Sequence, residues 1–151
     1  MAYTSTAAFA GRGSLLQYIQ PGTSPATYVT VAELRKLAFT GTKLDTADVT
    51  NMQSGVFREY IATLLDSGEL SFEGNYLPQD ATQDQVFRTF FNTAKQATWQ
   101  IVLPSTSGPA GGAGGNITFV AWVVSVDISV PVDKEASISG KLKITGAIGL
   151  P

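Results

Sequence analysis

Strict alternation of apolar and polar residues recurs in three segments and limits the folds open to this chain. In 69–76 the apolar residues Leu70, Phe72 and Tyr76 alternate with polar or charged ones, and the pattern returns in 122–130 and 138–145. A period of two places successive side chains on opposite faces of a β-strand. Antiparallel sheets commonly bury one face and expose the other, so the sequence predicts a mainly β protein with antiparallel sheets.

Six or seven strands and one helix are expected, within a single domain of 151 residues. Besides the alternating segments, strands are predicted at 14–20 and 97–104, and at 26–41, where the alternation slips near Ala32-Glu33 and suggests a bulge. Two sheets packed face to face, with the helix covering an end or edge, give a β-sandwich or barrel.

The helix is predicted within 79–96, where an apolar stripe repeats at helical spacing and consists of Val86, Phe87, Phe90, Phe91 and Ala94. Asp80 or Thr82 is expected to cap its N-terminus, and Lys95 is expected near its C-terminal end. In the later segment 122–130, Trp122 is expected on the apolar face and Asp127 on the polar face.

Four segments are expected to lie outside the regular core of the domain. They are an N-terminal arm at 1–13, a long loop at 40–68, a Gly-rich hairpin tip at 105–116 and a C-terminal tail at 147–151. The loop begins with a polar stretch without periodicity, and loops of this length in compact domains are usually functional or disordered. Its apolar residues between Phe57 and Leu65 recur at three- and four-residue steps, which predicts a short helical turn capped by Gly68.

The composition excludes several classes of function. The chain has no Cys and no His, which removes disulfides, thiolate or imidazole catalysis and nearly all zinc sites. Its net charge is -2 and its ten basic residues are scattered, unlike the dense array that electrostatic binding of nucleic acid requires. Only 15% of the residues are charged, which favours an oligomer with a partly covered surface. The apolar segment at 117–130 is too short and too polar to be read as a membrane span.

No combination of residues predicts catalysis, a metal or a cofactor. Glu69 and Glu73 share a strand face, but four steps along a strand separate them by roughly 13 Å. Paired glycosidase carboxylates need about 5–10 Å. Asp45 and Asp48 lack the spacing of a calcium loop, so they are interpreted as polar loop residues.

An ordered series of short motifs resembles a known family. The segment Phe57-Arg58-Glu59-Tyr60-Ile61 is followed by Leu65-Asp66 and Gly68, and then by Glu73-Gly74-Asn75-Tyr76. With the lead-in at 45–50, the helix after 77–80 and the closing 143–146, this order resembles the major tail tube proteins of long-tailed phages with non-contractile tails. Two departures are Thr63, where the family often has Gly, and the longer Gly-rich insert at 108–115.

The resemblance implies a structural virion protein and no enzyme. Such subunits form hexameric rings in which each subunit donates four strands to a continuous inner β-barrel, and the rings stack into a hollow tube through which DNA leaves the capsid. A tape-measure protein occupies the lumen during assembly, and tail terminator and distal tail or baseplate proteins bind the ends. The protein is then expected in the virion tail, assembled in the cytoplasm of the bacterial host, with no cofactor and no membrane partner.

Two sets of residues are predicted to serve this assembly. The loop 40–68 is expected to reach the neighbouring ring through Leu44, Asp45, Val49, Phe57, Arg58, Glu59, Tyr60 and Ile61. The lumen is expected to be lined by the polar strand residues Glu69, Glu73, Asp127, Lys141 and Lys143. Carboxylates on such a wall would oppose adhesion of DNA phosphates.

Three other functions remain open from the sequence. The inner tube of a contractile tail or secretion apparatus shares the ring architecture, and a sheath partner would distinguish it. A β-sandwich module that binds a receptor or a carbohydrate would need exposed aromatic residues around a concave site. A hydrolase is disfavoured by the absence of His and Cys and by the carboxylate spacing.

Overall fold

The computed structural model describes residues 11–19, 24–104 and 114–150, which form nine strands and one helix. The strands are β1 (Leu15–Ile19), β2 (Tyr28–Thr30), β3 (Leu34–Thr40), β4 (Lys43–Asp48), β5 (Tyr60–Asp66), β6 (Glu69–Asn75), β7 (Gln96–Val102), β8 (Asn116–Ser129) and β9 (Ser137–Gly149). The helix α1 (Asp84–Thr93) lies between β6 and β7 in the chain. The predicted mainly β fold with one helix is confirmed. The arm predicted at 1–13 and the tip predicted at 105–116 lie mostly outside the described residues.

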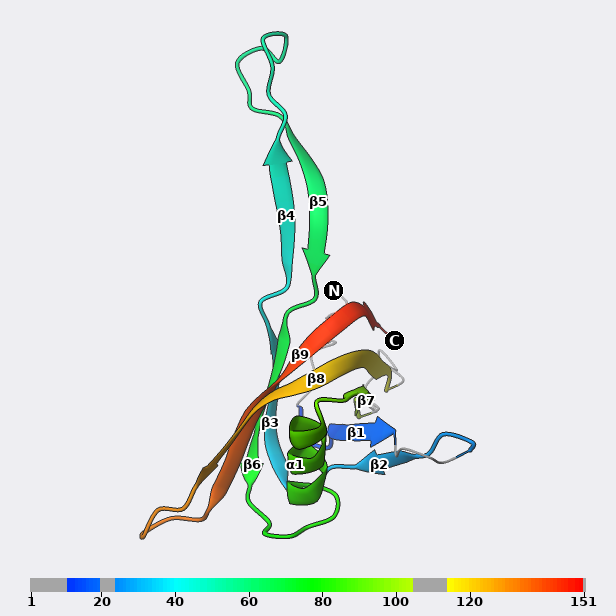
Figure 1. Cartoon of the computed structure of the whole chain (residues 1–151), viewed down its shortest axis with the longest axis vertical. Coiled ribbons are helices and arrows are strands. Elements are labelled where there is room, and N and C mark those ends of the chain that lie inside the picture. The colour runs from blue at the N-terminus through cyan, green and yellow to red at the C-terminus, as the bar shows by residue number, and fades with distance from the viewer. Residues whose placement is uncertain (1–10, 20–23, 105–113, 151) are drawn as a thin grey trace, which may run out of the picture.

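Seven of these strands form one sheet in the order β2-β1-β7-β8-β9-β6-β3, and every neighbouring pair is antiparallel. The sheet curls strongly. As a result Phe39 of β3 and Phe119 of β8, which lie on non-neighbouring strands, meet edge to face with ring centroids 5.5 Å apart. Register shifts in the β8–β9 ladder mark bulges that bend these long strands. Instead of two separate sheets face to face, one continuous sheet forms a half-barrel (Figure 1).

The core lies between the inside of this half-barrel and α1. Phe87 of α1 is fully buried and stacks on Phe72 of β6 at a centroid distance of 4.2 Å, and on Trp99 of β7 at 5.9 Å. Stacked aromatic rings add about 0.5–1.5 kcal/mol beyond the apolar area that they bury. From the predicted stripe, Val86, Phe87 and Phe90 are buried, whereas Phe91 remains half exposed.

The start of α1 differs from the prediction. Neither Asp80 nor Thr82 caps the helix, since the N-cap position is Gln83 and it makes no side-chain cap hydrogen bond. The Gln83 side chain is instead buried and bridges three backbone groups, accepting a hydrogen bond from the N–H of Leu77 and donating to the carbonyls of Ala32 and Asn75. Lys95 lies beyond the end of the helix, and its N–H bonds the carbonyl of Phe90.

The long strand predicted at 26–41 is two strands at opposite ends of the sheet. β2 pairs with β1, and β3 pairs with β6. Glu33 lies between them with φ 57°, in the left-handed region, and its carbonyl accepts the N–H of Asn75. The slip in the alternation at Ala32-Glu33 therefore marks a break between strands, where the chain crosses the open side of the half-barrel.

Candidate functional site

The segment 40–68 is a hairpin that leaves the body of the molecule. β4 and β5 form a separate two-stranded sheet, and Figure 1 shows it extending away from the seven-stranded sheet. The helical turn predicted over 57–65 is wrong, because 60–66 is strand β5. All seven residues of β5 are exposed, so neither face carries the buried stripe that would have shown a period of two.

The base of the hairpin is fixed to the body by close contacts. Gly68 has φ +80°, and a Cβ on it would lie 2.2 Å from the carbonyl oxygen of Thr40. Only glycine therefore fits where the segments before β4 and after β5 cross. Its carbonyl accepts the N–H of Ile144 in β9. Gly68 therefore does not cap a helix but holds the hairpin against the sheet.

Asp66 reinforces this junction. Its carboxylate accepts the N–H of Gly68 at 2.8 Å and the ammonium of Lys143 at 2.9 Å. Both contacts favour the charged form, and they lower the pKa of Asp66 from its usual value. The next residue, Ser67, donates its hydroxyl hydrogen bond to the carbonyl of Gly146 in β9.

The tip of the hairpin is held by its own hydrogen bonds. Thr50 donates its N–H to Asp48 at 2.9 Å, and its hydroxyl oxygen accepts the N–H of Glu59 at 2.9 Å. Ser54 donates to the Glu59 carboxylate at 2.9 Å and accepts the N–H of Asn51 at 3.0 Å. The hydrogen bonds from Thr50 lower the pKa of Asp48. These hydrogen bonds give the tip a defined backbone conformation.

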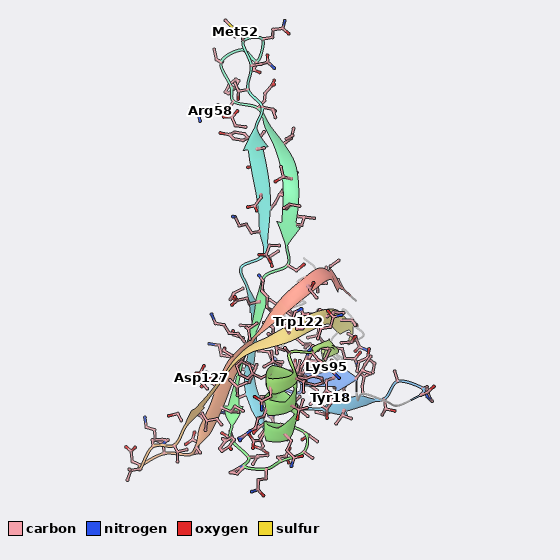
Figure 2. All side chains as sticks on the ribbon, viewed as in Figure 1. Tyr18, Met52, Arg58, Lys95, Trp122 and Asp127 are labelled. Carbon is pink, nitrogen blue, oxygen red and sulfur yellow. The ribbon has the colours of Figure 1, made fainter. Side chains whose placement is uncertain are left out.

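Apolar side chains cover this hairpin although none of them reaches the core. Val56 is 93% exposed and Phe57 is 80% exposed at the tip, and the other exposed apolar residues of the hairpin are Leu44, Val49, Met52, Tyr60, Ile61, Leu64 and Leu65. Figure 2 shows Met52 and Arg58 at the far end, away from the body. An isolated two-stranded hairpin is at best marginally stable in water, and a contiguous exposed apolar surface marks an interaction site.

The eight residues predicted to contact a neighbouring ring all lie on this hairpin. Leu44 and Asp45 are in β4, Tyr60 and Ile61 are in β5, and the remaining four are in the connecting tip, namely Val49, Phe57, Arg58 and Glu59. The prediction omitted Met52, Val56, Leu64 and Leu65, which are more exposed than several of the predicted residues. Consecutive apolar residues on both faces of β5 were the signal that could have identified Leu64 and Leu65, whereas Met52 and Val56 lie in the tip outside either strand.

The second surface is the outer face of the sheet, turned away from α1 and the core. Directly paired residues share a face of a sheet. One row across β3, β6, β9 and β8 contains Lys36, Glu73, Ser139 and Asp127. A second row contains Thr40, Glu69, Lys143 and Trp122. Lys141 lies in the row between them, opposite Ser71 and Ser125. All five residues predicted to line a lumen therefore lie on one face.

Charges on this outer face are mixed. The Lys141 ammonium lies 3.3 Å from the Glu69 carboxylate, and Lys143 is paired with Asp66. Trp122 is also on this face and partly exposed, contrary to the expectation that it belongs with Val126 and Ile128. A bulge between Val123 and Ser125 shifts the register. Odd-numbered residues of β8 therefore face the core before the bulge, and even-numbered residues face it after the bulge.

Titratable side chains in the part of the chain that the structure describes do not gather into a metal site. No three His, Cys, Asp or Glu side chains there are close enough to hold a metal ion. Asp84 is the buried carboxylate, and its burial opposes ionisation, yet the Arg88 guanidinium at 2.8 Å and the N–H of Gln79 outweigh this and lower its pKa. No helix among residues 11–19, 24–104 and 114–150 has the length and apolar character needed to cross a membrane.

Comparison with known proteins identified one family and several similar structures. A family model described as phage tail tube protein matches residues 8–149. A chain from the tail of an empty gene transfer agent particle is 22% identical, with a TM-score of 0.72 over 95% of this chain and 99% of that one. A chain from the anti-feeding prophage baseplate is 13% identical, with a TM-score of 0.71 over 98% and 97%. The SPP1 tail tube protein is 16% identical, with a TM-score of 0.59 over 88% and 72%. No curated protein sequence matches.

Proposed function

Because the chain belongs to the phage tail tube protein family, we propose that its copies form six-membered rings that stack into a hollow tail tube. The chain is then a structural component of a tail and not an enzyme. The number six is suggested by the similar tail of the gene transfer agent particle, which has C6 symmetry.

The observation that carries the proposal is the projecting β4–β5 hairpin. Its apolar side chains are exposed in the single subunit, and Val56 and Phe57 have almost no protein around them. Burial of apolar surface contributes about 25 cal/mol per Å², so these side chains provide a driving force for ring-on-ring stacking. The hairpin base is tied to β9, which directs the apolar tip away from its own body and toward another copy.

We further propose that the outer sheet face lines the central channel. Glu73 and Asp127 then repel DNA phosphates over a short distance, since the Debye length at physiological salt is about 8 Å, whereas the charge of Glu69 is offset by Lys141. Lys141 and Lys143 are neutralised locally by carboxylate partners, so neither offers a free cation to hold DNA. DNA would pass without being bound, and before that a tape-measure protein would occupy the same channel.

The ends of the tube are proposed to bind tail terminator and distal tail or baseplate proteins. The similarity to a chain in the anti-feeding prophage baseplate supports a common fold on both sides of such a junction. That similarity also supports a second candidate, the inner tube of a contractile tail or secretion apparatus. A sheath bound around the tube would distinguish the second candidate from a non-contractile tail.

Electron microscopy of the purified protein, and of the particles that contain it, tests the ring proposal. Stacked rings with a central channel are the expected result. A compact monomer that stays single at high concentration and in every buffer, together with particles whose tails lack the protein, would overturn the proposal and favour a β-sandwich binding module.

A further inference from the structure

We propose that the turn between β8 and β9 of one copy packs against Trp122 of a copy in the adjacent ring, so that an apolar seam closes the channel wall where two rings meet. The inference rests on the stacked rings proposed above. It concerns a contact separate from the β4–β5 hairpin, made by residues outside both sets predicted from the sequence.

The turn between β8 and β9 carries exposed apolar side chains at its tip. Residues 130–136 connect the two strands, and turns are usually built from Gly, Pro, Asn, Asp or Ser. This one begins with Val130-Pro131-Val132, in which Val130 is 73% exposed and Val132 is fully exposed. Figure 1 shows the turn at the end of the molecule opposite to the β4–β5 hairpin.

Two contacts hold this turn in place. The Arg35 guanidinium in β3 donates to the Glu135 carboxylate at 2.8 Å. The carbonyl of Ala136 accepts the N–H of Tyr76, directly after β6, at 2.9 Å. The turn is therefore tied to its own sheet at 135 and 136, and its apolar tip is presented to the outside.

A second apolar surface lies at the other end of the same strands. Trp122 of β8 is 38% exposed on the outer face, and Val124 at the β8 bulge is 45% exposed. We call these two residues the Trp122 patch. Trp122 pairs with Lys143, whose ammonium is bound by Asp66 at the base of the β4–β5 hairpin. The Trp122 patch thus lies beside the hairpin base, and the nearest cation is neutralised.

Between these two ends the outer face is polar. Apart from Ala38, the described outer-face residues of β3, β6, β9 and β8 there are polar or charged, including Lys36, Glu73, Ser125, Asp127, Ser139 and Lys141. The large exposed apolar side chains therefore lie at the two ends of the strands. These ends are where a ring in a stack would meet the rings on either side.

One subunit cannot make this contact by itself. Seven steps along β8 separate Trp122 from Ser129, roughly 23 Å at about 3.3 Å per residue. Strands in a barrel are tilted, but their opposite ends still face opposite ends of the channel. In a stack of rings, the turn of one copy then meets the Trp122 patch of another, and both lose contact with water.

Tryptophan fluorescence tests the contact because the two tryptophans of the chain lie in opposite settings. Trp99 is fully buried, whereas Trp122 is accessible to a soluble quencher such as acrylamide in the free subunit. When wild-type subunits assemble into tubes, we expect the quenching constant of the accessible component to fall at least about fivefold, because a packed interface excludes the quencher. Trp122→Phe reports Trp99 alone, and its weak quenching should not change on assembly.

The double variant Val130→Ser with Val132→Ser assigns the protection to the turn. Its subunits should fold as the wild type does, because both side chains are exposed. In its tubes, Trp122 should be at least about threefold more quenchable than in wild-type tubes, since the apolar cover is removed. Lys134→Ser changes an exposed polar residue of the same turn and should leave Trp122 protected.

Cross-linking is the second measurement, used if the serine variant forms no tubes. The chain has no cysteine, so Val132→Cys is combined with Val124→Cys and the tubes are oxidised. Five steps separate Val124 from the end of its own β8, roughly 16 Å, so a disulfide, which needs Cα atoms within about 7 Å, must join two copies. A covalent ladder of oligomers is the expected result. Val132→Cys with Glu73→Cys is the control and should give no ladder, because Glu73 lies in the polar middle of the face.

The outcomes separate this inference from the ring proposal. Wild-type tubes in which Trp122 is quenched as readily as in the free subunit would overturn the contact and leave the rings intact. Serine-variant tubes that protect Trp122 fully would do the same, as would the lack of a cross-link from Val124 where that variant forms no tubes. Failure of the wild-type protein to form rings in the microscope would overturn both.

Discussion

The ammonium nitrogen of Lys143 lies 2.9 Å from one carboxylate oxygen of Asp66 and 3.0 Å from the other, joining β9 to the last residue of the projecting hairpin. Asp66 also accepts the N–H of the close-packed Gly68. A single carboxylate thus connects the sheet, the hairpin and the tight crossing between them.

This arrangement predicts how the junction responds to acid. The pKa of Asp66 is lowered from its usual 3.8, chiefly by the Gly68 N–H and then by Lys143. Because the pKa of Asp66 is lower in the folded than in the unfolded state, the charged carboxylate stabilises the junction at any pH above the unfolded-state pKa. This stabilisation is lost as the pH falls through the folded-state pKa. We expect the NMR signal of the Gly68 amide to titrate with a midpoint below 3.8, and the titration to vanish in Asp66→Asn. A midpoint at or above the usual value would contradict the assignment.

Phe87 is expected to carry a large share of the stability of the subunit. It is fully buried between Phe72 and Trp99, so Phe87→Ala should leave a cavity and lower the free energy of unfolding by about 3–5 kcal/mol. Phe91→Ala on the same helix is the matched control, because Phe91 is half exposed, and it should cost less than about 1 kcal/mol. Urea unfolding of the unassembled subunit measures both free energies of unfolding. Similar decreases in the two variants would show that the stacked aromatic side chains of Phe72, Phe87 and Trp99 are not the centre of the core.

Gln83 is expected to act as a structural bridge. Gln83→Ala would leave the N–H of Leu77 and the carbonyls of Ala32 and Asn75 without their side-chain partner. Unsatisfied buried groups cost about 1–3 kcal/mol each, so with three such groups we expect the free energy of unfolding to fall by at least about 3 kcal/mol. The control Gln85→Ala removes an exposed hydrogen bond to the Gln79 carbonyl and should change stability by less than about 0.5 kcal/mol. Equal thermal unfolding temperatures for the two variants would refute this role.

Removing the apolar tip of the hairpin should separate folding from assembly. In the double variant Val56→Ser with Phe57→Ser, the subunit should keep its stability, because neither side chain contacts the core. Tubes should be lost or should form only at much higher concentration, as measured by sedimentation and electron microscopy. Gln53→Ser changes a polar residue in the same tip and should assemble as the wild type does. Normal tubes from the double variant would count against stacking through the hairpin.

Charge reversal on the outer sheet face should impair DNA passage and spare assembly. Glu73 and Asp127 lie in one row across β6, β9 and β8. We expect particles that carry Glu73→Lys with Asp127→Lys to have normal tails and slower DNA ejection, because added cations would attract phosphate. Glu73→Gln with Asp127→Asn should give an intermediate rate. Wild-type ejection rates in both pairs would place this face away from the channel.

The fold could be predicted where one strand face is buried. Residues Leu70 and Phe72 alternate with Glu69 and Glu73, so β6 was predicted within one or two residues. The charged residues of β6 and β9 occupy the alternate positions of these strands that point to the outer face. The hairpin was missed because neither face of β5 is buried in the subunit. With no buried face, the spacing of Phe57, Tyr60, Ile61, Leu64 and Leu65 imitates a helix.

Local backbone irregularities were the other limit. Glu33 takes a left-handed conformation that favours glycine, and nothing in its residue type predicts that the chain turns there. The bulge after Val123 reverses which residues of β8 face the core, so the alternation read through 122–130 placed Trp122 on the wrong side. Both features are determined by contacts between segments far apart in the chain.

The clearance at Gly68 has a consequence at a distance. Among the described residues the hairpin is held only at its base, so a small change in angle there produces a displacement that grows with distance along the hairpin. A methyl group at position 68 would push against the carbonyl of Thr40, tilting the hairpin, and Met52 at the far end would move furthest. In the proposed tube, the accuracy with which two subunits meet would therefore depend partly on the absence of one carbon atom, far from the place where they touch.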